Sequence, residues 1–104
     1  MAWLFLLAAG LLEIVWAYAM KQSAGFTRLG PILVMVPARV GSLMLLALAM
    51  RTLPLGTAYA IWTGIGALGA VVLGIALLGE VASPMRLLAI GLLLAGLVLL
   101  RLAE

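Results

Sequence analysis

Four long apolar runs, separated by short breaks, constrain this chain more than any other feature of its sequence. Each run has about 20 residues, the length that a helix needs to cross a bilayer core roughly 30 Å thick. With 68% hydrophobic and only 9% charged residues, the chain lacks the charged surface of a soluble domain. Backbone polar groups must pair within a bilayer, and the runs show no barrel-type alternation. We therefore expect an all-α membrane protein with four transmembrane helices.

The breaks between the runs set the expected helix bounds. Pro31 suits a first helical turn, and the segment "RTLPLG" interrupts the chain after the second run. The helices are expected at about 2–20, 31–50, 55–78 and 85–102. Together they are expected to form a single four-helix transmembrane domain over residues 1–104 that crosses the inner (plasma) membrane several times, surrounded by lipid.

The six basic residues are scattered singly along the chain, whose net charge is +3. This pattern is typical of anchors at membrane surfaces and does not form the patch that binds nucleic acid. The chain has no His and no Cys, so thiolate and imidazole metal sites are excluded. Neither a metal nor another cofactor is expected.

The basic residues also carry an orientation signal. With four spans, Arg51 and Arg101 fall on the side of the N-terminus, while Lys21, Arg28 and Arg86 fall on the other side. Two basic residues against three is a weak bias under the positive-inside rule. Two interpretations stay open. Either this bias fixes one orientation, or the chain inserts both ways and two copies form an antiparallel homodimer, in the manner of an inverted repeat.

A single acidic residue, Glu13, lies inside the first apolar run, in the segment "AGLLEIVWAYAMK" of residues 9–21. It lies roughly 18 Å along that helix at 1.5 Å per residue, near the middle of the bilayer. An acidic residue there costs about 2.5–3.5 kcal/mol, so such a group normally faces a cavity and marks an ion or proton path. The alternative is a protonated Glu13 that is hydrogen-bonded to a neighbouring helix.

Several aromatic and small residues lie near the depth of Glu13. They are Gly10 and Trp16 in the first helix, Ser42 in the second, and Tyr59, Trp62 and Gly66 in the third. A carboxylate framed by these groups suits an organic cation, because ring faces attract cations and the Tyr and Ser hydroxyls can orient the carboxylate. Trp3 fits an interfacial aromatic belt, whereas Trp16 and Trp62 lie too deep for that role.

The fourth helix has no polar side chain near the middle of the bilayer. Gly91 and Ala95 are four residues apart and form the small-xxx-small pattern that favours the association of membrane helices. We therefore expect this helix to mediate dimerisation.

The segments "LLEIVWAYAMK" and "TLPLGTAYAIWTGIGALGA", with the four-span length, resemble the small multidrug resistance transporters along essentially the whole chain. The "WTGIGA" segment is similar to their guanidinium-exporter branch more than to their quaternary-ammonium branch. The resemblance implies an antiparallel, dual-topology homodimer that exchanges protons for guanidinium ions, with Glu13 of both chains as the shared binding group. It also implies that the site is formed by Trp16, Ser42, Tyr59 and Trp62, with Gly10 lining it.

Arg39 departs from the family pattern, which has an apolar residue at this position, and it follows an additional Pro37. It lies one turn before Ser42 on the same helix face. Three arrangements are open. Arg39 extends to the membrane surface, it pairs with Glu13 and competes with the cation, or it lines the rim of the site. In the last arrangement it is a selectivity residue that restricts the site to small polar guanidinyl ions.

These features predict a proton-coupled antiporter that exports guanidinium and small guanidinyl cations. The nearest alternative is a proton-coupled multidrug exporter of quaternary ammonium cations, which the same aromatic groups can hold. A proteolipid rotor subunit also exchanges protons on a membrane carboxylate, but four spans and the aromatic groups argue against it. A structural accessory subunit of a membrane complex is a third alternative. No nucleophile–base pair is recognisable, so no enzymatic activity is expected.

Overall fold

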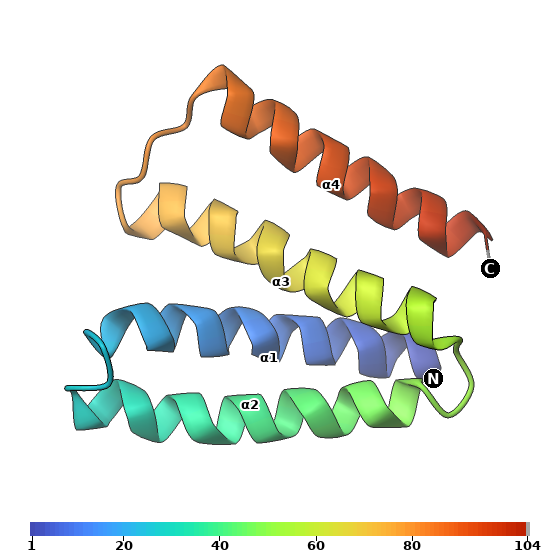
Figure 1. Ribbon diagram of the computed structural model, residues 1–104, viewed down its shortest axis with the longest axis horizontal. Coiled ribbons are helices and arrows are strands. Elements are labelled where there is room, and N and C mark those ends of the chain that lie inside the picture. Colours follow the sequence, from blue (N-terminus) through green and yellow to red (C-terminus); the bar gives the residue numbers. More distant parts are fainter. Residues whose placement is uncertain (104) are drawn as a thin grey trace.

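The computed structural model describes residues 1–103, which form four helices joined by short loops (Figure 1). The helices are α1 (Ala2–Gln22), α2 (Leu29–Ala49), α3 (Leu55–Leu77) and α4 (Pro84–Ala103). Each has 20 to 23 residues and is long and apolar enough to cross a membrane. The prediction of an all-helical chain with four helices of membrane-spanning length is confirmed.

The helix ends lie within two residues of the expected bounds, and the starts of α1 and α3 coincide with them. α1 extends to Gln22 because Lys21 and Gln22 both favour helix, and it stops before residues 24–26, which have positive φ values. α2 begins two residues before Pro31 and therefore holds this proline in its first turn. The proline is tolerated because the first N–H groups of a helix have no carbonyl partner within it.

α1 is the central helix of the bundle. It packs along its length against the antiparallel α2 on one side, and α3 crosses its other side (Figure 1). The buried apolar core consists of Leu6, Ala9, Leu46, Ala49, Ala58, Ile61 and Trp62. Three of these residues are alanines, and their small side chains let the helix backbones approach closely.

α4 lies beside α3 at the edge of the bundle (Figure 1) and has no buried residue. Leu97 packs against the core, and the guanidinium carbon of Arg101 lies 4.5 Å from the centre of the Trp3 ring of α1. Gly91 and Ala95 are both exposed. The expectation that α4 mediates dimerisation through these two residues stays a prediction.

Candidate functional site

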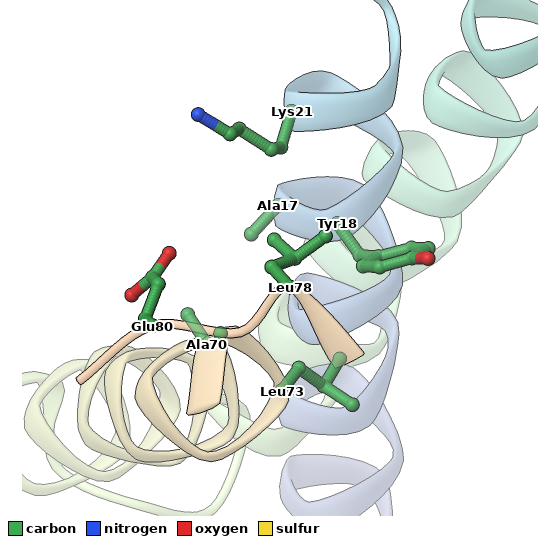
Figure 2. A pocket seen from close by; sticks show the side chains of 8 residues that line it. Ala17, Tyr18, Lys21, Ala70, Leu73, Leu78 and Glu80 are labelled. Atoms are coloured by element: carbon green, nitrogen blue, oxygen red, sulfur yellow. The ribbon is translucent and has the colours of Figure 1, made fainter. Parts of the chain in front are cut away.

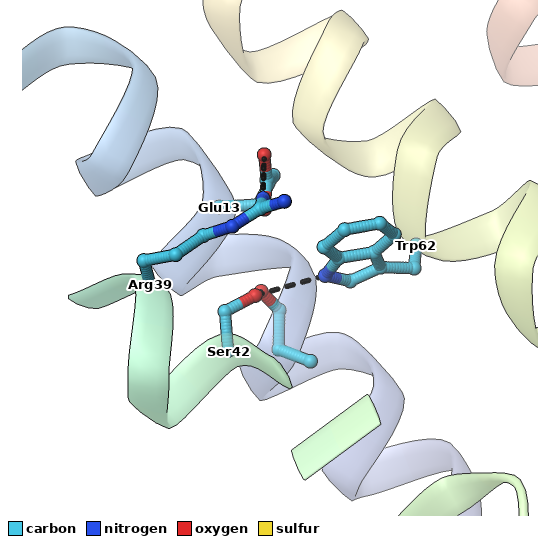
Figure 3. Close-up of polar contacts among 5 residues, drawn as sticks. Glu13, Arg39, Ser42 and Trp62 are labelled. Atoms are coloured by element: carbon cyan, nitrogen blue, oxygen red, sulfur yellow. Dashed lines mark hydrogen bonds and ion pairs between the residues drawn. The ribbon is translucent and has the colours of Figure 1, made fainter. Parts of the chain in front are cut away.

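A charged pair joins α1 to α2 inside the bundle. Nη1 of Arg39 in α2 donates to both carboxylate oxygens of Glu13 in α1, at 3.1 Å from Oε1 and 2.8 Å from Oε2 (Figure 3). The Glu13 side chain is 17% exposed and the Arg39 side chain is 36% exposed. Of the three arrangements that were open for Arg39, the structure shows the pairing with Glu13. A selectivity role for Arg39 at the rim of the site stays a prediction.

Two glycines allow α3 to approach α1 around this pair. A Cβ on Gly66 of α3 would lie 2.7 Å from Cγ of Glu13, so only glycine fits against the stem of that side chain. Gly10 of α1 is buried at another contact between the two helices, where a Cβ would lie 2.6 Å from Cγ2 of Ile65. Gly10 was expected to line the site, and the structure places it at this packing contact.

Two indole rings flank the Arg39 guanidinium group. Its central carbon, Cζ, lies 5.1 Å from the centre of the Trp16 ring and 5.5 Å from the centre of the Trp62 ring. Both distances fall within the range of about 6 Å over which ring faces attract cations. The site therefore combines one carboxylate with two aromatic faces, and the group that it holds is a guanidinium ion attached to the chain.

Ser42 fixes the position of the Trp62 indole. Its Oγ accepts a hydrogen bond from Nε1 of Trp62 at 2.8 Å and donates one to the carbonyl of Ala9 at 2.7 Å (Figure 3). Ser42 was expected to help orient Glu13; within this chain its hydroxyl bonds to Ala9 and Trp62 and not to Glu13, and the expected role stays a prediction. A hydroxyl has one proton, and the proton of Ser42 is used on Ala9. Ser42 thus contributes to the site through the indole.

Tyr59 lies next to Trp62 on α3, with the two ring centres 5.5 Å apart and the ring planes at 54°. Tyr59 as a whole residue is 52% exposed. Within residues 1–103 no hydrogen bond joins the Tyr59 hydroxyl to Glu13, whose carboxylate accepts from Arg39. The structure therefore brings Tyr59 to the edge of the site but not into contact with the carboxylate.

Replacing Ser42 with Ala should lower the free energy of unfolding by about 1–3 kcal/mol, because the buried Trp62 N–H loses its acceptor and the Ala9 carbonyl loses the hydrogen bond from Ser42. Unfolding of the purified protein in detergent, followed by circular dichroism, measures this loss. Thr63→Ala is the matched control, since the Thr63 hydroxyl is exposed and bonds only to carbonyls of its own helix. An equal loss in the two variants would contradict the role assigned to Ser42.

A second group of charged residues surrounds a cavity of about 150 Å³ at the C-terminal ends of α1 and α3. Figure 2 shows Lys21 of α1 and Glu80, which follows α3, on either side of it. Glu80 accepts a hydrogen bond from Nη1 of Arg86 at 3.1 Å, and these two side chains are 41% and 44% exposed. A pair this open to water contributes little, and Lys21 repels cations. The Glu13 site is therefore the better candidate for cation binding.

The sequence analysis placed Gly66 on the helix face of Tyr59 and Trp62 but assigned it no role in the site. The available signal was its spacing of four residues from Trp62, combined with the absence of a side chain beside a carboxylate in the membrane. In the part of the chain that the structure describes, no three His, Cys, Asp or Glu side chains come together as a metal site would require.

Comparisons with known proteins agree with this architecture. The family model of the Small Multidrug Resistance protein matches residues 1–93. A guanidinium exporter of Citrobacter freundii is 57% identical over 103 residues, which cover 99% of this chain and 98% of its own. A guanidinium exporter of Salmonella typhimurium strain LT2 is 58% identical with the same coverage. One of Yersinia pseudotuberculosis is 56% identical over 104 residues, the full length of both chains.

Proposed function

The chain belongs to the small multidrug resistance family and is a multi-pass protein of the inner membrane, and we propose that it exports guanidinium and small guanidinyl cations in exchange for protons. Relatives that are more than half identical over nearly the whole chain are named guanidinium exporters, which supports the substrate. Because these relatives are transporters, the same class is proposed here in place of an enzyme.

One observation carries the choice of substrate. The Glu13 carboxylate accepts hydrogen bonds from a guanidinium group that lies within cation–π distance of Trp16 and Trp62. That group belongs to Arg39, but its charge, planarity and N–H donors are those of the free ion. A site whose distances fit a guanidinium on a side chain also fits the same group on a small molecule.

Proton exchange follows from the chemistry of a single carboxylate. Glu13 is the only acidic residue within the spans of residues 1–103, and Arg39 is the one charged group that contacts it. A proton and a cation both neutralise the carboxylate, so binding of one displaces the other. If the site opens to one side of the membrane at a time, an inward proton gradient drives cation export without any covalent step.

We also propose that the working unit is an antiparallel homodimer in which Glu13 of both chains is shared. The nearly equal numbers of basic residues on the two sides support it. So does the exposure of Tyr59 at the edge of the site and of most of α4 in a single chain. A second copy can cover these apolar surfaces and complete the site with its own aromatic residues.

The alternative substrates are quaternary ammonium cations. Of the groups in the site, only the two aromatic faces suit them. Such ions have no N–H group and cannot use the hydrogen-bond acceptors of Glu13. They also need more space than a planar ion held between two indoles. The rotor-subunit and accessory-subunit alternatives gain nothing from the site geometry or from the relatives.

A transport assay tests the proposal. Proteoliposomes with an acidic interior, diluted into alkaline buffer with labelled guanidinium, should accumulate the ion as protons leave. One pH unit supports about tenfold accumulation for one-for-one exchange. The Glu80→Gln protein, altered at an acid outside the spans, should behave like the wild type. Accumulation of tetrapropylammonium in place of guanidinium would favour the alternative, and accumulation of neither would refute cation export.

A further inference from the structure

We propose that Arg39 is an internal competitor for the cation site, so that every transported cation must displace its guanidinium group from Glu13. This inference rests on the proposed function, because it assumes that Glu13 binds the transported ion. It assigns Arg39 the task of lowering the apparent affinity of the site for all cations by the same factor, whereas a rim residue would affect small and substituted cations differently.

The first support is that Arg39 contacts the groups of the site that a free cation would use. Its Nη1 contacts both oxygens of Glu13 (Figure 3). Its central carbon lies within cation–π distance of both Trp16 and Trp62. A free cation needs the same carboxylate and the same ring faces. The two occupants therefore exclude each other, and binding of a substrate requires that the Arg39 side chain moves away.

The second support is that the tethered group makes an incomplete set of hydrogen bonds. Arg39 reaches the two carboxylate oxygens through a single nitrogen, Nη1. A free guanidinium ion can rotate until two nitrogens each donate to one oxygen, the stronger arrangement for this pair of groups. The Arg39 side chain is 36% exposed in the single chain, so protein atoms do not enclose it and it has room to move off Glu13. When a free guanidinium ion displaces Arg39, Glu13 exchanges a contact with one nitrogen for a contact with two.

The fraction of molecules in which Arg39 is away from Glu13 determines how far the apparent dissociation constant of a cation is raised. If Arg39 occupies Glu13 in about nine of ten molecules, the apparent dissociation constant of any competing cation rises about tenfold. This factor is the same for every ion that needs Glu13. A rim residue, in contrast, would change the affinities of small and substituted cations by different factors. Competition and rim selectivity are thus distinguishable by measurement.

The experiment compares wild type with Arg39→Met, Arg39→Lys and Arg86→Met. Arg86→Met is the matched control, because it breaks the other Arg–Glu pair of the described chain, which lies outside the site. Dissociation constants of guanidinium and methylguanidinium are measured on purified protein by tryptophan fluorescence. Arg39→Met should bind both ions about tenfold more tightly, Arg39→Lys should be intermediate, and Arg86→Met should match the wild type.

Each outcome is informative, because damage to the fold weakens binding and cannot imitate a gain in affinity. Unchanged or weaker guanidinium binding by a folded Arg39→Met protein, with normal binding by the wild type, would overturn the inference and leave the proposed function intact. Tighter binding of methylguanidinium alone would replace competition by rim selectivity. If neither wild type nor Arg39→Met binds either ion, the proposed function fails and the inference fails with it.

A second measurement tests the competition in the unaltered protein. In protein labelled with ¹⁵N-arginine, the side-chain signals of Arg39 are assigned from the spectrum of Arg39→Lys. Adding guanidinium should shift the Arg39 signals towards those of a freely rotating side chain and leave the Arg86 signals in place. Saturation with guanidinium that leaves the Arg39 signals unchanged would overturn the inference, since both groups would then be bound at once.

Discussion

Replacing Glu13 with Gln is expected to reduce guanidinium transport by about a hundredfold or more. The amide keeps the shape of the side chain but lacks the charge that a cation needs and the basicity that a proton needs. The measurement is proton-driven uptake of guanidinium into proteoliposomes. Glu80→Gln is the control for the loss of one acidic residue, because Glu80 lies outside the spans and bonds to Arg86.

The pairing with Arg39 complicates this variant, because Glu13→Gln leaves a partly buried guanidinium without its anion. Removing one member of such a pair destabilises a fold. The double variant Glu13→Gln/Arg39→Met removes both charges, so its free energy of unfolding should exceed that of the single variant while transport stays lost. Robust coupled transport by either variant would place the binding site elsewhere in the chain.

Fixing the orientation of the chain is expected to remove most of its transport activity. The variant Ala24→Lys/Phe26→Lys adds two lysines to the loop between α1 and α2. The number of basic residues on the side of this loop then rises from three to five, against two on the side of the N-terminus. Both positions are exposed, and both already hold a residue other than glycine at positive φ, so lysine adds no new backbone strain. Under the positive-inside rule this protein inserts one way, and antiparallel pairs cannot form.

The control for this prediction is a copy with the opposite bias. The variant Lys21→Gln/Arg28→Gln leaves one basic residue on the side of the α1–α2 loop, against two on the side of the N-terminus. Each biased protein alone should be weakly active, and expression of the two together should restore transport. The chain has no cysteine, so a single cysteine introduced into a loop of each biased protein, labelled from each side of the membrane, reports the orientations. Full activity in a population with a single orientation would eliminate the antiparallel homodimer.

The elements of the fold could be predicted from the sequence, but not all of their packing. Apolar runs of membrane-spanning length, with Pro31 and the segment "RTLPLG" between them, placed the helix ends within two residues of those in the structure. The position of α4 beside α3 could not be predicted from the sequence. Apolar side chains of α4, most of them leucine, lie on all of its faces, so no polar face distinguishes the side that contacts protein from the side that contacts lipid.

The site was predictable where helix period and depth decide the position of a residue. Glu13 and Trp16 share a face of α1, and the structure brings Trp62 of α3 to the same place. Which of the three arrangements Arg39 adopts was not predictable, because a long side chain can reach several places and the separation of α1 and α2 depends on packing. The direction of the Ser42 proton depends on the Ala9 carbonyl of another helix, which no local pattern reveals.

The pairing of Glu13 with Arg39 also bears on how the first half of the chain enters the bilayer. Either charge alone, at the centre of a helix in lipid, opposes insertion by about 2.5–3.5 kcal/mol. α1 and α2 are consecutive, joined only by residues 23–28, and packed along their length. The acid and the base can therefore neutralise each other as soon as the two helices lie together. During biosynthesis the two helices are expected to leave the translocon as one hairpin, because the hairpin carries no net charge into the hydrocarbon.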